Sequence, residues 1–375
     1  MKGGGVVRTS LRVAPRNDEG NDLPYPSVRN DKQSGSEHVP QPIRAHAIRI
    51  HENGGPEVLR FEEVEVPPPG PGEVRLRHTA IGLNYADVNL RRGTFYLHTK
   101  LALPAIIGNE GAGVIESVGP DVAALKPGDR VVYVAPSGMA AQPGAYSEMR
   151  VIEAERLVRI PDGVSDEQAA AALLKGLTAW CIVRRVFPVK PGHSVLVHAA
   201  AGGVSSFLVQ WAKHLGATVI GTVGSAEKER TARALGCDHV IRYRDVDWVA
   251  AVNAIVPGGV SAVFDGVGKD VFLASLDCLD GFGTLVNFGN ASGAPPPLDI
   301  RPLAHRGAQM VTRIGMGFFF YERSVLDEAT AELFGLIEKG VLTPSVTQRY
   351  ALRDAAQAHR DLEERKTTGS VVLVP

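Results

Sequence analysis

The stretch Ser194-Val-Leu-Val-His-Ala-Ala-Ala-Gly-Gly-Val-Ser-Ser-Phe-Leu-Val-Gln-Trp-Ala-Lys-His-Leu215 decides the fold. It opens with a short apolar run typical of a strand, and Phe207, Trp211 and Leu215 then recur with helical spacing. Between these parts, residues 199–203 carry no side chain larger than a methyl group, so backbone amides can approach a bulky anion at the positive end of the helix dipole. The sequence therefore predicts a strand–turn–helix unit that binds the pyrophosphate of a dinucleotide.

One position departs from the usual glycine fingerprint of such turns. A third small residue normally lets the helix lie close to the sheet, and this chain has Ser205 there instead of glycine. A Gly-Gly pair by itself is more often an ordinary loop. The strand before it and the helix after it favour the nucleotide site.

Length and composition indicate a globular protein with two domains. The chain has 375 residues, of which 44% are hydrophobic and 22% charged. With 40 basic and 41 acidic side chains the formal net charge is -1, which gives no general attraction to nucleic acid or to an anionic membrane. We expect neither as a partner.

The cysteines Cys181, Cys237 and Cys278 lie far apart, which argues against a disulfide framework and against a thiolate zinc site. No apolar run approaches the roughly 20 residues needed to span a bilayer. The N-terminus also lacks the apolar core of a secretory signal. A cytoplasmic location is expected.

Residues 1–42 are rich in Gly, Pro, Ser, Asn, Asp and Arg and show no periodicity, so we expect a disordered extension. A transit peptide is the alternative, and the acidic residues in this segment argue against it. From Ile43 onward short strand patterns alternate with Gly/Pro turns, as at 45–50, 59–66, 74–80, 111–119 and 130–134. This texture predicts a compact, strand-rich domain over residues 43–168.

Strand and helix patterns alternate after that domain, following two helices expected at 168–174 and 178–186. Such alternation implies a parallel sheet covered on both faces, over residues 169–310. Residues 311–375 contain one amphipathic helix and a terminal strand, too little for a third domain, and are expected to complete the first one. The fold class is therefore α/β, with a doubly wound parallel sheet and a strand-rich second domain.

The end of the second strand of the α/β part indicates which dinucleotide binds. NAD sites place an acidic residue there, whereas this strand ends in Gly224-Ser225 without a carboxylate. Lys228, Arg230 and the pair Tyr243-Arg244 offer donors and positive charge where a 2′-phosphate would lie. NADPH is therefore favoured as the cofactor. The alternative is that Lys228 and Arg230 form a solvated helix face beside neighbouring glutamates.

The strand-rich domain lacks the residues of a catalytic zinc site. No cysteine precedes Cys181, and Asn109, in the turn Gly108-Asn109-Glu110-Gly111, stands where zinc-binding alcohol dehydrogenases have a histidine. No metal site is expected.

Together these motifs resemble the zinc-free medium-chain dehydrogenase/reductases, specifically the NADPH:quinone oxidoreductase family that includes zeta-crystallin. The resemblance covers residues 43–375. It rests on these stretches: Gly82-Leu83-Asn84-Tyr85-Ala86-Asp87-Val88, Lys175-Gly176-Leu177-Thr178-Ala179, Val197-His198-Ala199-Ala200-Ala201-Gly202-Gly203-Val204, Gly221-Thr222-Val223-Gly224-Ser225, Phe288-Gly289-Asn290-Ala291-Ser292-Gly293 and Thr367-Thr368-Gly369-Ser370.

The resemblance implies a GroES-like catalytic domain, a Rossmann domain and a homodimer. It implies Asn84, Asp87 and Tyr85 at the catalytic end of the cleft. The residues it assigns to the cofactor are Asn84, Thr178, Ala201, Gly202, Gly203, Val204, Gly224, Ser225, Lys228, Tyr243, Phe288, Gly289, Asn290 and Arg365. Asn89 and Phe95 stand where relatives often have tyrosines, which puts the substrate preference in doubt.

For each catalytic candidate a structural role is the alternative. Asn84 is expected to donate its amide to substrate or nicotinamide, or else to stabilise a turn at a strand end. Asp87 is expected to position other groups rather than act as an acid. Tyr85 is a candidate proton donor or a packing residue, and His198 is expected to be a hydrogen-bonded core histidine.

Three functions stay open at this point. The first is reduction of quinones by hydride or electron transfer from NADPH without zinc, where the protein mainly orients the reactants. The second is reduction of α,β-unsaturated carbonyls or enoyl thioesters, which also needs a proton donor for carbon. The third is a non-catalytic NADPH-binding role, structural or in contact with RNA.

Overall fold

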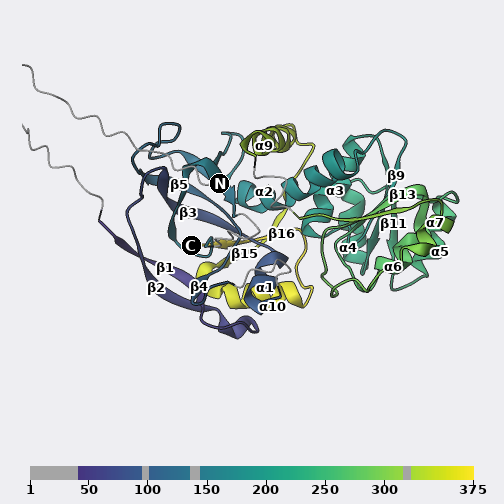
Figure 1. The fold of residues 1–375 in the computed structure, drawn as a ribbon, viewed down its shortest axis with the longest axis horizontal. Helices are drawn as coiled ribbons and strands as arrows, with labels where there is room; N and C mark the ends of the chain where they lie inside the picture. The colour runs from purple at the N-terminus through teal and green to yellow at the C-terminus, as the bar shows by residue number, and fades with distance from the viewer. Residues whose placement is uncertain (1–40, 95–100, 136–143, 316–321) are drawn as a thin grey trace, which may run out of the picture. The chain divides into compact units, whose positions relative to one another are not determined.

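The structure is a computed structural model that describes residues 41–94, 101–135, 144–315 and 322–375. Most of the expected extension at 1–42, and Phe95, therefore lie outside the described residues. The described residues belong to one compact unit (Figure 1). No helix in its described ranges is long and apolar enough to cross a membrane.

A parallel sheet forms the centre of the α/β part. Within the described residues its strand order is β11-β10-β9-β12-β13-β14, and every neighbouring pair is parallel. This is the order of a dinucleotide-binding Rossmann sheet. The strands are β9 Ser194–Val197, β10 Thr218–Val223, β11 His239–Arg242, β12 Val260–Asp265, β13 Leu279–Asn287 and β14 Met310–Arg313.

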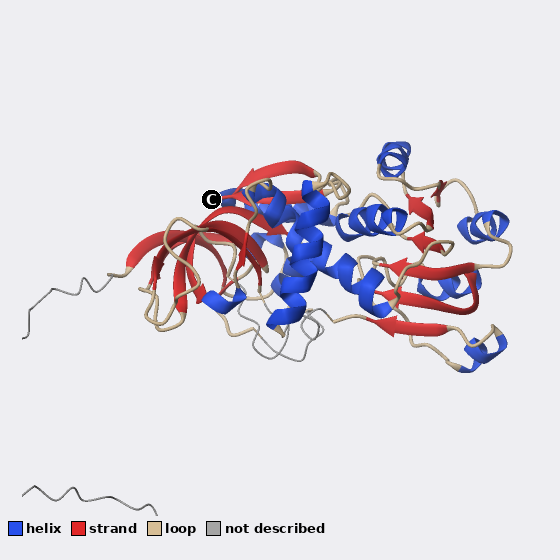
Figure 2. Cartoon of the chain, turned by 90° about the horizontal axis from the view of Figure 1, so that it is seen from above, coloured by secondary structure: helices blue, strands red, loops and turns tan. Residues whose placement is uncertain are grey.

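Both faces of this sheet are covered, as the run of apolar residues in its strands predicts. Val195 and Val197 of β9 pack into the same core as helix α3, whereas Leu196 between them packs with α5 and α6 on the other face. Figure 2 shows helices on both sides of the strands. The bounds are α3 Gly203–His214, α4 Ala226–Ala234, α5 Trp248–Ile255, α6 Phe272–Ser275 and α7 Arg301–His305.

The strand-rich part contains a larger mixed sheet and a smaller antiparallel one. The larger sheet runs β15-β16-β3-β5-β6-β8, with β7 pairing beside β3, and the smaller runs β2-β1-β4, within the described residues. The strands are β1 Ile43–Ile50, β2 Arg60–Val66, β3 Glu73–Leu83, β4 Ala105–Ile106, β5 Glu110–Val118, β6 Arg130–Val134, β7 Met149–Glu153, β8 Val158–Arg159, β15 Val346–Ala351 and β16 Ser370–Val374.

The C-terminal segment contributes to the strand-rich sheet, because β16 pairs antiparallel with β3. Its helices are α9 Arg323–Glu338 and α10 Ala355–Glu363, and α1 Tyr85–Arg92 follows β3 directly. The α/β class with a separate strand-rich part is confirmed. The expected domain limits at 168 and 310 stay predictions, and the second falls at the start of β14.

Helix α2, Asp166–Trp180, connects the two parts of the fold. Ser165 caps it by accepting from the Gln168 amide, and the Gln168 side chain accepts from the Ser165 amide in return. The expected break between two helices at 174–178 is absent: α2 is continuous and passes into a π-helical turn at Cys181–Val186. Gly176 does not end the helix because it lies buried against α9.

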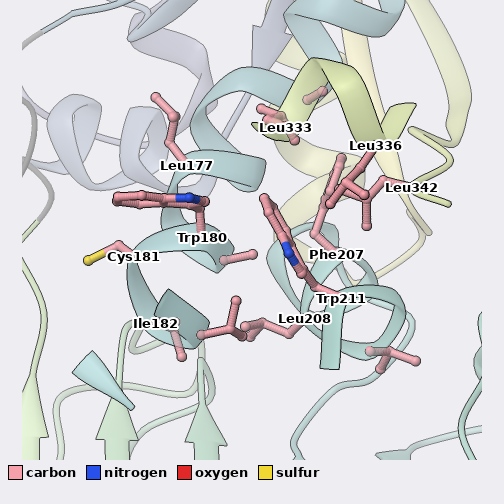
Figure 3. Close-up of a cluster of buried hydrophobic side chains, with 14 of the residues drawn as sticks. Leu177, Trp180, Cys181, Ile182, Phe207, Leu208, Trp211, Leu333, Leu336 and Leu342 are labelled. Carbon is pink, nitrogen blue, oxygen red and sulfur yellow. The ribbon is translucent and has the colours of Figure 1, made fainter. Parts of the chain in front are cut away.

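A single hydrophobic core joins α2, α3 and α9. Figure 3 shows Trp180 of α2 and Trp211 of α3 in one cluster, with Leu333 and Leu336 of α9 beside them. Both indole rings are fully buried, and Trp180 also donates its Nε1 hydrogen to Glu332 at 2.9 Å. This packing fixes the orientation of α2 relative to α3, and therefore the positions of the α2 residues that lie near the start of α3.

Two helical glycines test this packing. A methyl group on Gly176 would lie 2.5 Å from Leu333 Cδ1, whereas one on Gly335 of α9 would meet nothing within 4 Å. Gly335→Ala should therefore raise the free energy of unfolding by about 0.5–1 kcal/mol through better helix propensity. Gly176→Ala should lower it, because overpacking costs about 1–3 kcal/mol. Urea unfolding of both variants checks this; equal shifts would contradict the close α2–α9 contact.

Candidate active site

The glycine turn lies between β9 and α3, where the sequence predicts it. Gly202 is the N-cap of α3, and Ala199 adopts a left-handed conformation with φ of 50° that bends the chain off the strand. The Gly202 amide donates to the Ala199 carbonyl at 2.7 Å, which closes the turn. Ala201 is buried, and Gly203 and Val204 are half-buried at the start of the helix. The turn thus presents the positive end of α3 to a ligand.

The structure explains Ser205. Its hydroxyl is buried and donates to the backbone carbonyl of His198 at 2.8 Å, so the side chain ties the first turn of α3 back to the end of β9. His198 itself bonds Thr222 and Ser275 through its two ring nitrogens. Burial lowers the pKa of His198 to about 3, so the ring is neutral. His198 is therefore the expected core histidine.

The end of β10 carries a cluster of donors. Ser225 caps α4 and accepts from the Lys228 amide, and a methyl group on Gly224 would lie 2.6 Å from the Tyr243 hydroxyl oxygen. Glycine at 224 thus lets that hydroxyl close over the strand end. Lys228 Nζ donates to the backbone carbonyl of Arg365 at 3.3 Å, which brings the C-terminal segment to the same place.

Positive charges face one another in this cluster. The pKa of Lys228 is lowered by burial first, and then by the charges of Arg365 and Arg244. Like charges that are held together without an equal number of acids favour an anion between them. Such an arrangement can accept a phosphate group, and the assignment of Lys228, Tyr243 and Arg365 to the cofactor stays a prediction.

The segment after β13 forms the other end of the cleft. The Phe288 ring covers Gly266, where a methyl group would lie 2.6 Å from ring atom Cε2. Asn287 donates to Asp265 at 2.9 Å and to the Gly289 carbonyl at 2.9 Å, so the backbone at 289 is held in place. Asn290 lines a cavity of about 380 Å³.

Tyr85, the first residue of α1, reaches the same segment. Its hydroxyl donates to the Ala291 carbonyl at 3.3 Å, which links the strand-rich part to the α/β part. Asn89, one helical turn along, is half-buried and accepts from the Thr94 hydroxyl at 3.5 Å. Thr178 is buried on α2, with its hydroxyl donated to Leu174 of its own helix at 2.7 Å.

Asn84 is buried and serves as the N-cap of α1. Its side-chain amide donates to Glu110 Oε2 at 2.8 Å and to the Gly82 carbonyl at 3.3 Å. The side-chain amide of Asn84 therefore has two acceptors within the protein, which is consistent with a turn-stabilising role. Its donation to substrate or nicotinamide stays a prediction.

Asp87 lies at the centre of a buried polar network. Its carboxylate accepts from the backbone N–H of Asn84 at 2.9 Å, from Asn109 Nδ2 at 2.6 Å and from the Tyr146 hydroxyl at 3.2 Å. Asn109, where zinc-binding enzymes have a histidine, thus forms a hydrogen bond to Asp87. Among the residues with a described position, no group of three or more His, Cys, Asp and Glu side chains is arranged to hold a metal.

The network continues to α10 with a fixed direction. Arg91 has only donors, and its Nη1 lies 3.0 Å from His359 Nδ1, which must therefore accept. The remaining hydrogen of His359, on Nε2, points to the Tyr146 oxygen at 3.0 Å, and Tyr146 donates to Asp87. Burial, and then the charge of Arg91, lowers the pKa of His359 to about 3. A proton wire along this chain would have to begin at a guanidinium, so the chain does not relay protons to Asp87.

Sequence reasoning missed Tyr146, Arg91 and His359. Tyr146 and His359 lie 59 and 213 residues from the partners they contact, and no local pattern marks such pairs. Asn109 was noticed as a missing metal ligand, and only the structure shows that it binds Asp87.

Comparison with protein families finds two matches. The model described as an alcohol dehydrogenase GroES-like domain matches residues 70–162, and the model described as a zinc-binding dehydrogenase matches residues 235–373. The zinc in the second description is a property of the family model, and the described residues of this chain contain no group of three or more His, Cys, Asp and Glu side chains that could hold a metal.

Individual relatives cover nearly all of the described chain. A quinone oxidoreductase of Pseudomonas aeruginosa is 44% identical over 88% of this chain and 100% of the relative. A 2-haloacrylate reductase of a Burkholderia species is 43% identical over 88% of this chain and 98% of the relative. The solved structure of Escherichia coli quinone oxidoreductase complexed with NADPH is 41% identical, with a TM-score of 0.83, over 88% of this chain and 100% of that one.

The buried Asp87 gives a pH-dependent prediction. Burial raises the pKa of its carboxyl to about 7, against roughly 3.9 in an unfolded chain. The folded protein therefore binds this proton more tightly, and the stability that the group contributes is present below about pH 4 and is lost as the pH rises to about 7. Asp87→Asn has no such proton, so its stability relative to wild type should rise across that window, by up to about 1.4 kcal/mol per pH unit, and stay level above it.

Urea unfolding of both proteins between pH 4 and pH 8 measures this difference. The buried histidines titrate in both proteins, so their contribution cancels. Asp162→Asn, which removes an exposed carboxyl, is the matched control. Parallel stability curves for wild type and Asp87→Asn would show that the Asp87 carboxyl is not destabilised by burial.

Proposed function

Because the chain belongs to the zinc-free medium-chain dehydrogenase/reductases, the NADPH:quinone oxidoreductase family that includes zeta-crystallin, we propose that a quinone is its substrate. The protein is an NADPH-dependent oxidoreductase with NADPH as its cofactor. The quinone assignment is supported by the quinone oxidoreductases that match this chain at 42–44% identity. An expected homodimer and a cytoplasmic location stay predictions.

Two groups of residues fit this cofactor: the glycine turn between β9 and α3, and the cluster of donors at the end of β10. The turn at Gly202 and Gly203 leaves room that a side chain would fill, and we assign the pyrophosphate to it together with Ala201, Val204 and Thr178. The cations Lys228 and Arg365, with Ser225, Gly224 and Tyr243, take the 2′-phosphate. Phe288, Gly289 and Asn290 flank the nicotinamide, which supplies the hydride when the cofactor is bound.

One observation carries the choice of a quinone: neither Tyr85 nor Asp87, the two acids among the catalytic candidates, is free to protonate carbon. The Tyr85 hydroxyl is donated to a backbone carbonyl, and Asp87 is fully buried and held by three donors. A quinone that accepts a hydride becomes a hydroquinone anion, whose oxygen takes its proton from water. Reduction of a carbon–carbon double bond instead needs a positioned acid.

The second candidate is reduction of an α,β-unsaturated acid or carbonyl. It is favoured by the 43% identity to a 2-haloacrylate reductase, which is close to the value for the quinone oxidoreductases. In that reaction Tyr85 would have to leave Ala291 and act as the acid. Asn84, Asp87 and Tyr85 are then the residues that shape the substrate end in either reaction.

Steady-state oxidation of NADPH against a substrate panel separates the two. The panel contains ortho- and para-quinones, enals, enoyl thioesters and 2-haloacrylate. We expect kcat/KM for the best quinone to exceed that for every unsaturated acid, enal or thioester. Turnover of 2-haloacrylate or of an enoyl thioester without turnover of quinones would contradict the proposal.

Lys228→Ala tests the proposed 2′-phosphate site at the end of β10. A charge-assisted hydrogen bond contributes about 1.5–3 kcal/mol, so the KM for NADPH should rise about tenfold or more. The KM for NADH should change much less, because NADH has no 2′-phosphate. The variant Lys190→Ala, which removes an exposed lysine before β9, is the control. Equal changes in the KM values for NADPH and NADH would contradict the assignment of Lys228 to the 2′-phosphate site.

A further inference from the structure

A buried lysine lies next to the glycine turn without a full set of partners. Lys175 is on α2 and is 5% exposed. Its side chain passes over the first residue of α3, because a methyl group on Gly203 would lie 3.1 Å from Lys175 Cε and 3.2 Å from its Cδ. The end of the lysine side chain thus lies between the start of α3 and Glu110 of β5.

The ammonium group has more hydrogens than acceptors. It carries three hydrogens, and within the described residues its hydrogen-bond and ion-pair partner is Glu110 Oε2, at 3.5 Å. Charge-assisted hydrogen bonds are typically about 2.7–2.9 Å long. The pair is therefore loose, although both side chains are almost completely shielded from water.

Glu110 is already satisfied by other donors. Its Oε2 accepts from Asn84 Nδ2 at 2.8 Å, and its Oε1 accepts from the Leu174 amide at 2.6 Å. Leu174 lies in the third turn of α2, so the carboxylate reaches into the hydrogen-bonding of that helix. Glu110 is thus fixed in place, and the spare bonding capacity belongs to Lys175.

The start of α3 does not favour the positive charge of Lys175. Gly202 gives no side-chain cap, and no acidic residue lies in the first turn of this helix. The free backbone N–H groups there carry partial positive charge. The Lys175 ammonium is paired with Glu110 only at 3.5 Å, and an anion bound at the start of α3 would interact favourably with both the ammonium and these N–H groups.

We propose that Lys175 is a further cofactor-binding residue, which donates to the nicotinamide-side phosphate of NADPH at the start of α3. The nicotinamide side follows from its neighbours: Lys175 shares Glu110 with Asn84 at the start of α1, whereas the Lys228 cluster lies at the end of β10. The inference rests on NADPH as the cofactor and not on the quinone as substrate.

Glu110 then acts as a positioning residue. It holds the ammonium beside α3 before the phosphate arrives, and the same carboxylate holds the Asn84 amide and the Leu174 backbone. Binding at α3 is in this way connected to the start of α1, where the catalytic candidates lie. Removal of Lys175 alone would leave Glu110 as a buried, unpaired charge, so a test needs a variant that neutralises both.

The double variant Lys175→Met/Glu110→Gln provides that test. Its dissociation constants for NADPH and for adenosine 2′,5′-bisphosphate are measured by fluorescence titration and calorimetry. The bisphosphate keeps the adenosine half of the cofactor and lacks the nicotinamide-side phosphate. We expect the constant for NADPH to rise about tenfold or more and that for the bisphosphate to change less than twofold. Lys228→Ala, by contrast, should weaken both ligands.

Wild-type affinity of the double variant for NADPH would overturn the proposal. An equal loss of both ligands would also overturn it, because Lys175 would then act on the adenosine half or on the fold. The single variant Glu110→Gln adds a test in which the effect of NADPH should become larger instead of smaller. Its ammonium has lost the competing carboxylate, so the melting temperature without ligand should fall and the rise on adding NADPH should exceed that of wild type; an unchanged rise would count against the proposal.

These measurements involve binding and melting only. A protein that binds NADPH through Lys175 and reduces no quinone would contradict the proposed substrate and leave this inference supported. A protein that reduces quinones with wild-type NADPH affinity in the double variant would do the reverse.

Discussion

The buried carboxylate of Glu110 is the constraint on which the site depends. It lies in β5, fully shielded from water, and is bonded to the start of α1 through Asn84 and to the middle of α2 through Leu174. A methyl group on Gly82 would lie 2.4 Å from this carboxylate and 2.3 Å from the Ala170 carbonyl, so β3 also passes close to both. A buried charge must be paired and hydrogen-bonded. The need to satisfy one acid therefore sets the relative positions of a strand pair, a capping residue and the connecting helix.

The parts that the sequence predicted well are those decided by neighbouring residues. The run from Ser194 to Leu215 contains its own strand, turn and helix, and the structure forms them as β9 and α3. Ser225 similarly caps α4 three residues before the amide that it accepts from. Ser205 was the exception within this stretch. Its partner, the His198 carbonyl, is only seven residues away, yet a glycine fingerprint does not indicate a hydroxyl that bonds the preceding strand.

The parts that were not predicted depend on contacts across the chain. The role of Asn84 stays a prediction, and the direction of its side-chain amide is set by Glu110, which lies 26 residues later in the sequence. The break expected in α2 was wrong for a similar reason. Glycine weakens a helix by its own propensity, but Gly176 allows Leu333 of α9 to pack at close range, and this tertiary contact decides the outcome. Local preference cannot reveal a neighbour that lies 157 residues away.

The direction of the hydrogen bonds also limits the chemistry. Since Arg91 cannot accept, His359 must donate to Tyr146 and Tyr146 to Asp87, and every bond in the row points toward the carboxylate. These bonds stabilise the ionised form of Asp87, while burial opposes it more strongly. Asp87 is thereby held at the start of α1 by three hydrogen bonds. A site built in this way can orient an acceptor, and in the proposed reaction the proton of the product comes from water. Protonation by the solvent is easier for an acceptor whose reduced form is an oxygen anion than for one whose reduced form is a carbanion, which needs a positioned acid.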